Sequence, residues 1–243
     1  MLVGMVQVYN EVANGNLERC LSSLSRYCDA IQIYDDGSTD EPHDIYVKYN
    51  CDVIWGQTNS FKDELAHKQA QLDRCKELGA TAILRLDCDE NIETSGEEYI
   101  RDLLKEPKPS WAFHTINLWR HPAFYRLDNS YNAVVFNRLW HVPHEGLKFK
   151  VQRGLHLTNY PIGVTEGEGF APFEIIHWGF ASDKAILDKY KMYKEHGQYG
   201  PALDRLIDER GLVIKYSLPQ WFHEKFERPV YNKIFGVPIA SLV

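Results

Sequence analysis

Short apolar runs alternate with helical patterns over the first 91 residues of the chain. The apolar runs lie at residues 2–9, 30–34, 52–55 and 81–86. Apolar residues at helical spacing fill the gap after the first run and the gap before the last, where Gly79 ends the pattern. Short apolar strands that alternate with helices are typical of parallel strands joined by helical crossovers. We therefore predict an α/β fold in which helices cover both faces of a mainly parallel central sheet.

The rest of the 243-residue chain follows a different pattern. Aromatic-rich, strand-like segments lie at residues 111–119, 131–139 and 173–178. Ser182 or Asp183 is a good cap for a following helix, and a second helix is predicted at residues 201–209. No repeat or low-complexity linker divides the sequence, so we expect one continuous fold rather than two independent domains.

The charge balance and the cysteines exclude some classes of function. The chain has 27 Lys and Arg residues against 34 Asp and Glu residues, a net charge of −7, which argues against nucleic-acid binding through bulk positive charge. No apolar run reaches the ~18–20 residues of a membrane span, and the N-terminus lacks the basic start of a signal peptide. The 5 cysteines are odd in number and form no Cys-x-x-Cys motif, which favours a reduced, cytoplasmic setting.

Polar clusters follow three of the predicted strands at the points where they end. These clusters are Asn10-Glu11, the segment at residues 35–38, and Asp87 with Asp89. In an open α/β sheet, ligands bind beyond the carboxyl ends of the strands. If the strands are parallel, all of the clusters converge on one edge of the sheet, and we expect the binding site there.

Each acidic cluster suggests a chemistry of its own. Carboxylates such as Asp87 and Asp89 suit hard cations, Mg²⁺ or Mn²⁺, that neutralise a diphosphate leaving group. An aspartate in the segment 35–40 can accept hydrogen bonds from a base N–H or a ribose hydroxyl, while Gly37 permits a tight turn. Simpler interpretations stay open, namely a solvated strand-end turn for the first cluster and a turn with a helix cap for the second.

The order of these motifs resembles family 2 glycosyltransferases of the GT-A fold. The matching segments are residues 6–11 (VQVYNE), 17–24 (LERCLSSL), 33–40 (IYDDGSTD) and 86–90 (LDCDE). The resemblance implies a GT-A fold, a nucleotide-sugar donor, with UDP-sugar favoured, and Mn²⁺ or Mg²⁺ as cofactor. It implies that Asp35 or Asp36 contacts the nucleoside, that Asp87 lies near the ribose and the metal, and that Asp89 is a direct metal ligand. The predicted donor-binding set is Val8, Tyr9, Asn10, Glu11, Asp35, Asp36 and Asp87.

The second half of the chain extends this resemblance. The segment His144-Glu145-Gly146 is similar to the His-Glu element of enzymes related to lipopolysaccharide-core glycosyltransferases. An inverting transfer needs a base that takes the proton of the acceptor hydroxyl, and Glu145 is the candidate. His177 resembles the late histidine that completes the metal site with Asp87 and Asp89, and imidazole favours Mn²⁺ over Mg²⁺. A loop carboxylate for Glu145 and a structural hydrogen bond for His177 are the alternatives.

The resemblance also sets the expected domain organisation and partners. Residues 1–180 form the predicted transferase domain, with a nucleotide-binding half at 1–91 and an acceptor half at 111–180. Residues 181–243 form a helical extension packed on the same domain. The acceptor is a glycan, a lipid-linked molecule or a protein, and the aromatic tail near Trp221 is the place for any peripheral membrane contact.

Other classes of protein fit the sequence less well. A sugar-nucleotide pyrophosphorylase needs a Gly-rich loop ending in Arg after the first strand, where this chain has residues 9–13 (YNEVA). A phosphatase that forms an aspartyl phosphate expects Thr or Val two residues after the second Asp, and Asn91 lies there. A zinc site at His141 and His144 lacks further ligands. A non-catalytic nucleotide-sugar binder stays open as the alternative function.

Overall fold

The computed structural model describes residues 1–94, 96–125, 135–143, 146–150, 153–154, 158–164, 168–197 and 206. The chain forms two compact units, one of residues 1–114 with 135–175 and one of residues 115–134 with 176–243. Strands β6 and β10 each begin in the first unit and end in the second. The domain boundary predicted at residue 180 stays a prediction.

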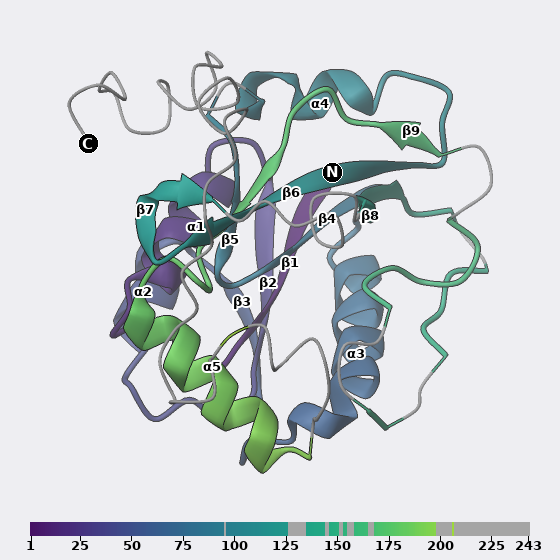
Figure 1. The fold of residues 1–243 in the computed structure, drawn as a ribbon. Helices are drawn as coiled ribbons and strands as arrows, with labels where there is room; N and C mark the ends of the chain where they lie inside the picture. The colour runs from purple at the N-terminus through teal and green to yellow at the C-terminus, as the bar shows by residue number, and fades with distance from the viewer. Residues whose placement is uncertain are drawn as a thin grey trace. The chain divides into compact units, whose positions relative to one another are not determined.

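Helices and strands alternate through the first unit, as the sequence pattern predicts (Figure 1). Its elements are β1 (Leu2–Val8), α1 (Asn16–Leu24), β2 (Ala30–Asp35), α2 (His43–Lys48), β3 (Asp52–Trp55), α3 (Glu64–Glu77), β4 (Ala82–Asp87), β5 (Glu90–Ile92), α4 (Ile100–Leu103), β6 (Ser110–Trp119), β8 (Val135–His141), β9 (Gly169–Phe170) and β10 (Ile175–His177). Short 3₁₀ turns at Phe61–Asp63 and Glu97–Tyr99 lead into α3 and α4. The second unit contains β7 (His121–Tyr125), which pairs with the end of β6, and α5 (Asp183–Glu195).

The sheet of the first unit has a parallel half and an antiparallel half. Strands β3, β2, β1 and β4 lie side by side in that order and are all parallel. Strand β8 continues the sheet antiparallel to β4, and β6 pairs antiparallel with β8. The chain runs outward from β1 to β3 and then returns to place β4 on the other side of β1. The strand order therefore reverses between β1 and β4, which is where ligands bind in open α/β sheets.

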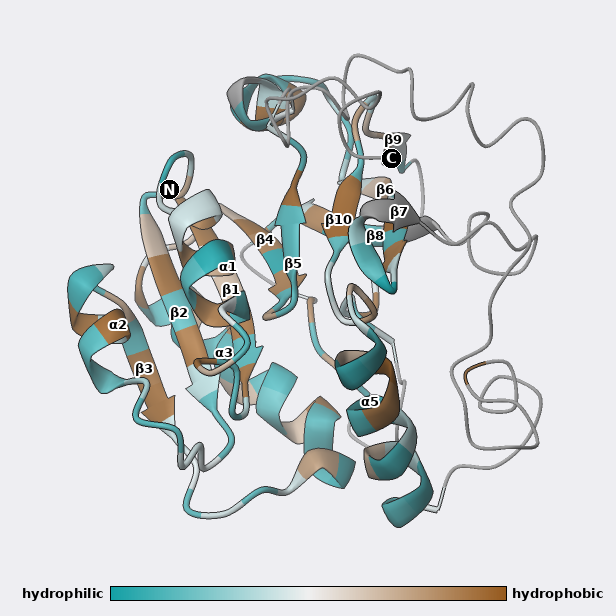
Figure 2. Cartoon of the chain, turned by 60° about the vertical axis from the view of Figure 1, so that its left-hand side comes forward, coloured by the Kyte–Doolittle hydropathy of each residue, from teal (hydrophilic) through white to brown (hydrophobic). Residues whose placement is uncertain are grey.

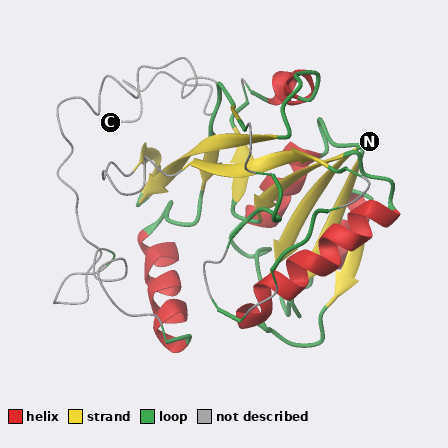
Figure 3. Cartoon of the chain, turned by 90° about the vertical axis from the view of Figure 1, so that its right-hand side faces the viewer, coloured by secondary structure: helices red, strands yellow, loops and turns green. Residues whose placement is uncertain are grey.

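Helices cover both faces of the parallel strands, so the predicted α/β fold class is confirmed (Figure 3). Leu17, Leu21 and Leu24 of α1 pack against one face, together with residues of α2. Leu65, Leu72 and Cys75 of α3 pack against the opposite face. Successive side chains of a strand point to opposite faces, so each of these strands contributes to both helix–sheet contacts.

Several local predictions are confirmed and some elements are new. Gly79 follows α3 with φ +85°, a left-handed conformation that favours glycine, and Ser182 caps α5 by accepting the N–H of Ala185. Strands β5, β7 and β9 were not predicted. The helix predicted at 201–209 lies outside the described residues except for Leu206. Within the described ranges, none of the helices has the length and apolar character needed to cross a membrane.

Candidate functional site

Polar loops meet at the carboxyl edge of β1, β2 and β4, as the sequence predicts. The parallel register places Val8 beside Asp35 and Gln7 beside Asp87. The loop after β1 is tied to the loop after β2, because the N–H of Asn10 donates to Ser38 Oγ at 3.1 Å. In return, the side-chain oxygen of Asn10 accepts the N–H of Thr39 at 2.8 Å. These bonds hold two of the predicted clusters in one fixed arrangement, next to the point between β1 and β4 where the strand order reverses.

Asp35 lies at this edge but is committed to holding its own loop. Its side chain is buried, with one oxygen accepting the N–H of Ser38 at 2.7 Å and the other accepting the hydroxyl of Tyr46 at 2.6 Å. Gly37 follows with φ +79°, and a Cβ there would lie 2.9 Å from Thr58 Cα. The turn after β2 is therefore locked from both sides, and of the two adjacent aspartates Asp36 is the better candidate for a ligand contact.

Asp36 is buried at the start of a hydrogen-bonded chain of side chains. Its carboxylate accepts the N–H and the hydroxyl of Ser60, at 3.1 and 3.0 Å to Oδ1. The Ser60 hydroxyl lies 3.0 Å from His67 Nε2, and His67 Nδ1 lies 3.0 Å from the amide nitrogen of Gln7. Burial raises the pKa of Asp36 and lowers the pKa of His67.

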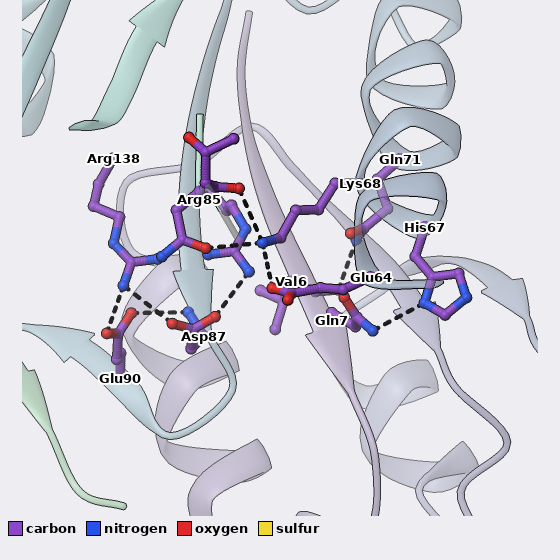
Figure 4. Close-up of polar contacts among 12 residues, drawn as sticks. Val6, Gln7, Glu64, His67, Lys68, Gln71, Arg85, Asp87, Glu90 and Arg138 are labelled. Carbon is purple, nitrogen blue, oxygen red and sulfur yellow. Dashed lines mark hydrogen bonds and ion pairs between the residues drawn. The ribbon is translucent and has the colours of Figure 1, made fainter. Parts of the chain in front are cut away.

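Asp87 lies between two buried arginines (Figure 4). Arg85 from β4 donates to one oxygen at 2.8 Å, and Arg138 from β8 donates to the other at 3.0 Å. Arg138 also donates to Glu90 at 2.7 Å, and Glu90 accepts the backbone N–H of Asp87 at 2.9 Å. Burial opposes ionisation of Asp87, but the two guanidinium charges outweigh it and hold its pKa well below the usual range. Asp87 is therefore a fixed carboxylate.

Lys68 adds a third buried cation on the same face of the sheet (Figure 4). Its ammonium group bonds to Glu64, to the carbonyl of Thr158 at 3.2 Å and to Asn159 Oδ1 at 2.9 Å. Burial, and then the charge of Arg85, lower the pKa of Lys68 to about 7. Lys68 thus ties the segment at residues 158–164 to α3.

The buried cations were not predicted, although the sequences of β4 and α3 each carry a pattern that indicates one. Arg85 stands inside the apolar run Ile83-Leu84-Arg85-Leu86, where a charge has to be buried. Glu64, Lys68 and Gln71 repeat at helical spacing on the side of α3 that also carries Leu65, Leu72 and Cys75. Polar residues in an otherwise apolar pattern point to a paired, buried cluster.

The predicted metal ligands differ in the charged groups that surround them. Both oxygens of Asp87 already accept from guanidinium groups. In the second unit, His177 Nδ1 lies 2.6 Å from Asn117 Oδ1, and its Nε2 lies 3.2 Å from the Lys189 ammonium group. Asp87 and His177 each have a cationic neighbour, which disfavours a second positive charge beside them in this arrangement, and their role as metal ligands stays a prediction. No group of three or more His, Cys, Asp or Glu side chains among the described residues is placed to hold a metal ion, and the role of Asp89 stays a prediction.

The remaining predicted residues fall into different settings. Tyr9 is 41% exposed at the edge of the sheet, whereas Val8 is buried in β1. Glu11 accepts from the side chains of Asn14 and Asn16 at 2.6 and 2.8 Å and so organises the start of α1. His144 and the predicted base Glu145 lie outside the described residues.

Comparison with known proteins gives structural likeness only. No family model matches the chain, and no curated protein matches it. Among solved structures it is similar to S. aureus TarS residues 1–349, with a TM-score of 0.38 and 18% identity over 53% of this chain and 38% of that chain. The TarS complex with UDP gives 0.36 and 19% over 49% and 36%, and the complex with UDP-GlcNAc gives 0.36 and 20% over 49% and 34%. The chain thus spans well under half of the structures it matches, and likeness at this level carries no assignment of function.

Proposed function

We propose that this chain is a glycosyltransferase that moves a sugar from a nucleotide-diphosphate donor, with a UDP-sugar favoured, to an acceptor hydroxyl with inversion. The observation that carries the proposal is the convergence of Asn10, Asp36 and Asp87 at the carboxyl edge where the strand order reverses between β1 and β4. The ordered motifs that resemble family 2 glycosyltransferases of the GT-A fold support the same assignment.

The buried contacts suggest a division of labour at this edge. Asp36 is the acceptor for a donor group of the base, since Asp35 is committed to Ser38 and Tyr46. Arg85 and Arg138 keep Asp87 negatively charged and in a fixed position. Its carboxylate is therefore suited to accept hydrogen bonds from the hydroxyl groups of the ribose. The carboxylate of Asp87 is held in place before the donor binds, so it needs little reorganisation when the donor arrives.

Two parts of the proposal rest on the motif resemblance. As the resemblance implies, Asp87, Asp89 and His177 would hold a Mn²⁺ or Mg²⁺ ion. When bound, such an ion neutralises charge on the diphosphate leaving group. Glu145 is the proposed base for the acceptor hydroxyl, which belongs to a glycan, a lipid-linked molecule or a protein.

Binding measurements test the donor assignment. Calorimetry with UDP, GDP, dTDP and CDP, each with Mn²⁺ and with EDTA, should show one preferred nucleotide. We expect Asp36→Asn to weaken it, while Asp44→Asn, at a fully exposed site on α2, serves as the control. Failure of all four nucleotides to bind would overturn the proposal. Equal nucleotide affinity in Mn²⁺ and in EDTA would contradict only the proposed role of the metal ion.

Turnover separates an enzyme from a nucleotide-sugar binder. Glu145→Gln keeps the size of the side chain but cannot take a proton, so the transfer rate should fall by roughly 10²–10⁴ with donor affinity little changed. Glu106→Gln at an exposed site is the matched control. A product that retains the anomeric configuration of the donor would contradict inversion and the assignment of Glu145.

A further inference from the structure

Four polar side chains form a continuous hydrogen-bonded chain in the first unit. Gln7 comes from β1, Asp36 follows β2, Ser60 precedes the turn that leads into α3, and His67 lies on α3. The successive contacts are 3.0 Å from Gln7 Nε2 to His67 Nδ1, 3.0 Å from His67 Nε2 to Ser60 Oγ, and 3.0 Å from Ser60 Oγ to Asp36 Oδ1. Figure 4 shows the contact between Gln7 and His67 beside the buried cations.

The charge of Asp36, together with the amide nitrogen that Gln7 turns toward His67, fixes the direction of every bond in this chain. A carboxylate only accepts, so the Ser60 hydroxyl donates to Asp36. The Ser60 oxygen then accepts from Nε2–H of His67, which leaves Nδ1 as the acceptor for the amide N–H of Gln7. The arrangement therefore requires a neutral His67 that carries its proton on Nε2.

The surroundings of His67 favour the same neutral form. Its side chain is 6% exposed, and its ring stacks on Tyr34 with centroids 4.2 Å apart. The charged groups that face it are Asp36, whose Oδ1 lies 4.0 Å from Nε2, together with Asp63 and Glu64. Burial outweighs their attraction and lowers the pKa of His67 below its usual value.

The same contacts leave one carboxylate oxygen of Asp36 able to accept a further hydrogen bond. Both close contacts from Ser60 go to Oδ1, and among the described residues Oδ2 receives only the shared backbone N–H at 3.2 Å. Oδ2 thus keeps a lone pair for a further donor. The Asp36 side chain is 1% exposed, so a ligand reaches Oδ2 only when the residues that cover it shift.

We propose that Gln7, His67 and Ser60 form a positioning relay that holds Asp36 as an oriented acceptor for the base of the bound nucleotide. The inference rests on the proposed function and names its base selectivity. A fixed carboxylate acceptor favours a base with a ring N–H donor, such as uracil, thymine or guanine. It disfavours cytosine, whose corresponding ring nitrogen is an acceptor, because two acceptors would face each other.

The relay itself is tested without any nucleotide. Nitrogen-15 NMR of the imidazole side chains should show His67 neutral at pH 7 with the proton on Nε2, and His67→Phe identifies its signals. In Ser60→Ala, Nε2–H loses its acceptor, so the Nε2 resonance should shift. A charged His67 at pH 7, or a proton on Nδ1, would overturn the relay.

Base selectivity is then measured as the ratio of the UDP and CDP affinities. The wild-type ratio should be about 10- to 100-fold, the value of a hydrogen bond to a charged group. His67→Phe and Ser60→Ala should lower this ratio about tenfold, while His67→Gln, which keeps a donor and an acceptor, should restore part of it. Gln71→Met is the matched control, because Gln71 is also buried on α3 and, within the described part of the chain, donates only to the carbonyl of Val6.

The outcomes separate this inference from the proposed function. An unchanged ratio in His67→Phe, or an equal loss in Gln71→Met, would overturn the positioning role. If the wild type binds no nucleotide, the proposed function and the base selectivity fail together. The NMR measurement still decides whether the relay sets the proton on His67.

Discussion

The two faces of the parallel sheet in the first unit differ in what they bury. On the side of α1, the strand residues Leu2, Val6, Val8, Leu84 and Leu86 form one apolar cluster with the helix. On the side of α3, β1 and β4 begin with Val3 and Ile83 but end with Gln7, Arg85 and Asp87. Figure 2, coloured by hydropathy, shows how apolar and polar residues are distributed over these strands. Adjacent residues of the same strands therefore contribute apolar side chains to the α1 face and polar side chains to the α3 face.

This difference separates stability from binding. The α1 face removes apolar surface from water, which is the dominant favourable contribution to folding. The α3 face buries Lys68, Arg85 and Arg138, whose desolvation offsets much of what their partners contribute. The polar part of that face lies next to the edge where the ligand is proposed to bind. The chain thus places its costly buried charges where fixed charges have a use.

The largest expected effect is the loss of a buried cation from the α3 face. Arg138→Met removes the partner of Asp87 and Glu90, which leaves buried negative charge and should destabilise the protein by about 3–5 kcal/mol. Urea denaturation measures the change in the free energy of unfolding. The double variant with Glu90→Gln should lose less than the sum of the single losses. A loss in the free energy of unfolding below about 1 kcal/mol for Arg138→Met would show that the ion pairs of this face contribute little to stability.

The next effect is the loss of packing on the α1 face. Leu21→Ala removes a side chain that is 0% exposed and should cost about 2–5 kcal/mol in the same assay. Val47→Ala on α2, where the residue is 65% exposed, is the control and should change stability by less than about 0.5 kcal/mol. Leu21→Ala should leave the ratio of UDP and CDP affinities unchanged. A change in that ratio would contradict the separation of the two faces.

The sequence predicts the arrangement of strands better than it predicts the partners of the polar residues. Alternating strands and helices are enough to predict parallel strands, and parallel strands are enough to predict that Asn10, Asp36 and Asp87 share one edge. Pairing depends on contacts between residues far apart in the chain. Arg138 lies 51 residues after Asp87, and no local pattern connects them.

The same limit explains why the predicted site needed refinement. The adjacent residues Asp35 and Asp36 look equivalent in sequence, but Tyr46 and Ser38 occupy Asp35 and leave Asp36 as the candidate. Asp87 looks like a metal ligand by spacing, yet two buried guanidinium groups surround it. Spacing in the sequence predicts on which face and at which edge of the sheet a side chain lies. The charges that surround that side chain depend on how the fold packs. The assignment of Glu145 stays a prediction.

The smallest effect, a pH dependence, tests whether the α3 face holds its lysine at a cost. The pKa of Lys68 is 10.5 in the unfolded reference and about 7 in the folded protein. Between these values the unfolded chain binds more protons, so the contribution of Lys68 to stability rises with pH above about 7 and is constant below it. Relative to Lys68→Met, the free energy of unfolding of the wild type should therefore increase by about 1 kcal/mol from pH 6 to pH 8.

Urea denaturation of both proteins at several pH values measures this difference, in which the titration of all other groups largely cancels. Gln71→Met is again the control, because it alters the same buried face without removing a titratable group, and its difference from the wild type should stay flat with pH. A difference for Lys68→Met that is flat or falls with pH would mean that Lys68 remains fully charged in the folded protein. In that case Glu64, Thr158 and Asn159 compensate its burial completely, and the two faces of the sheet would differ in polarity but not in the cost of what they bury.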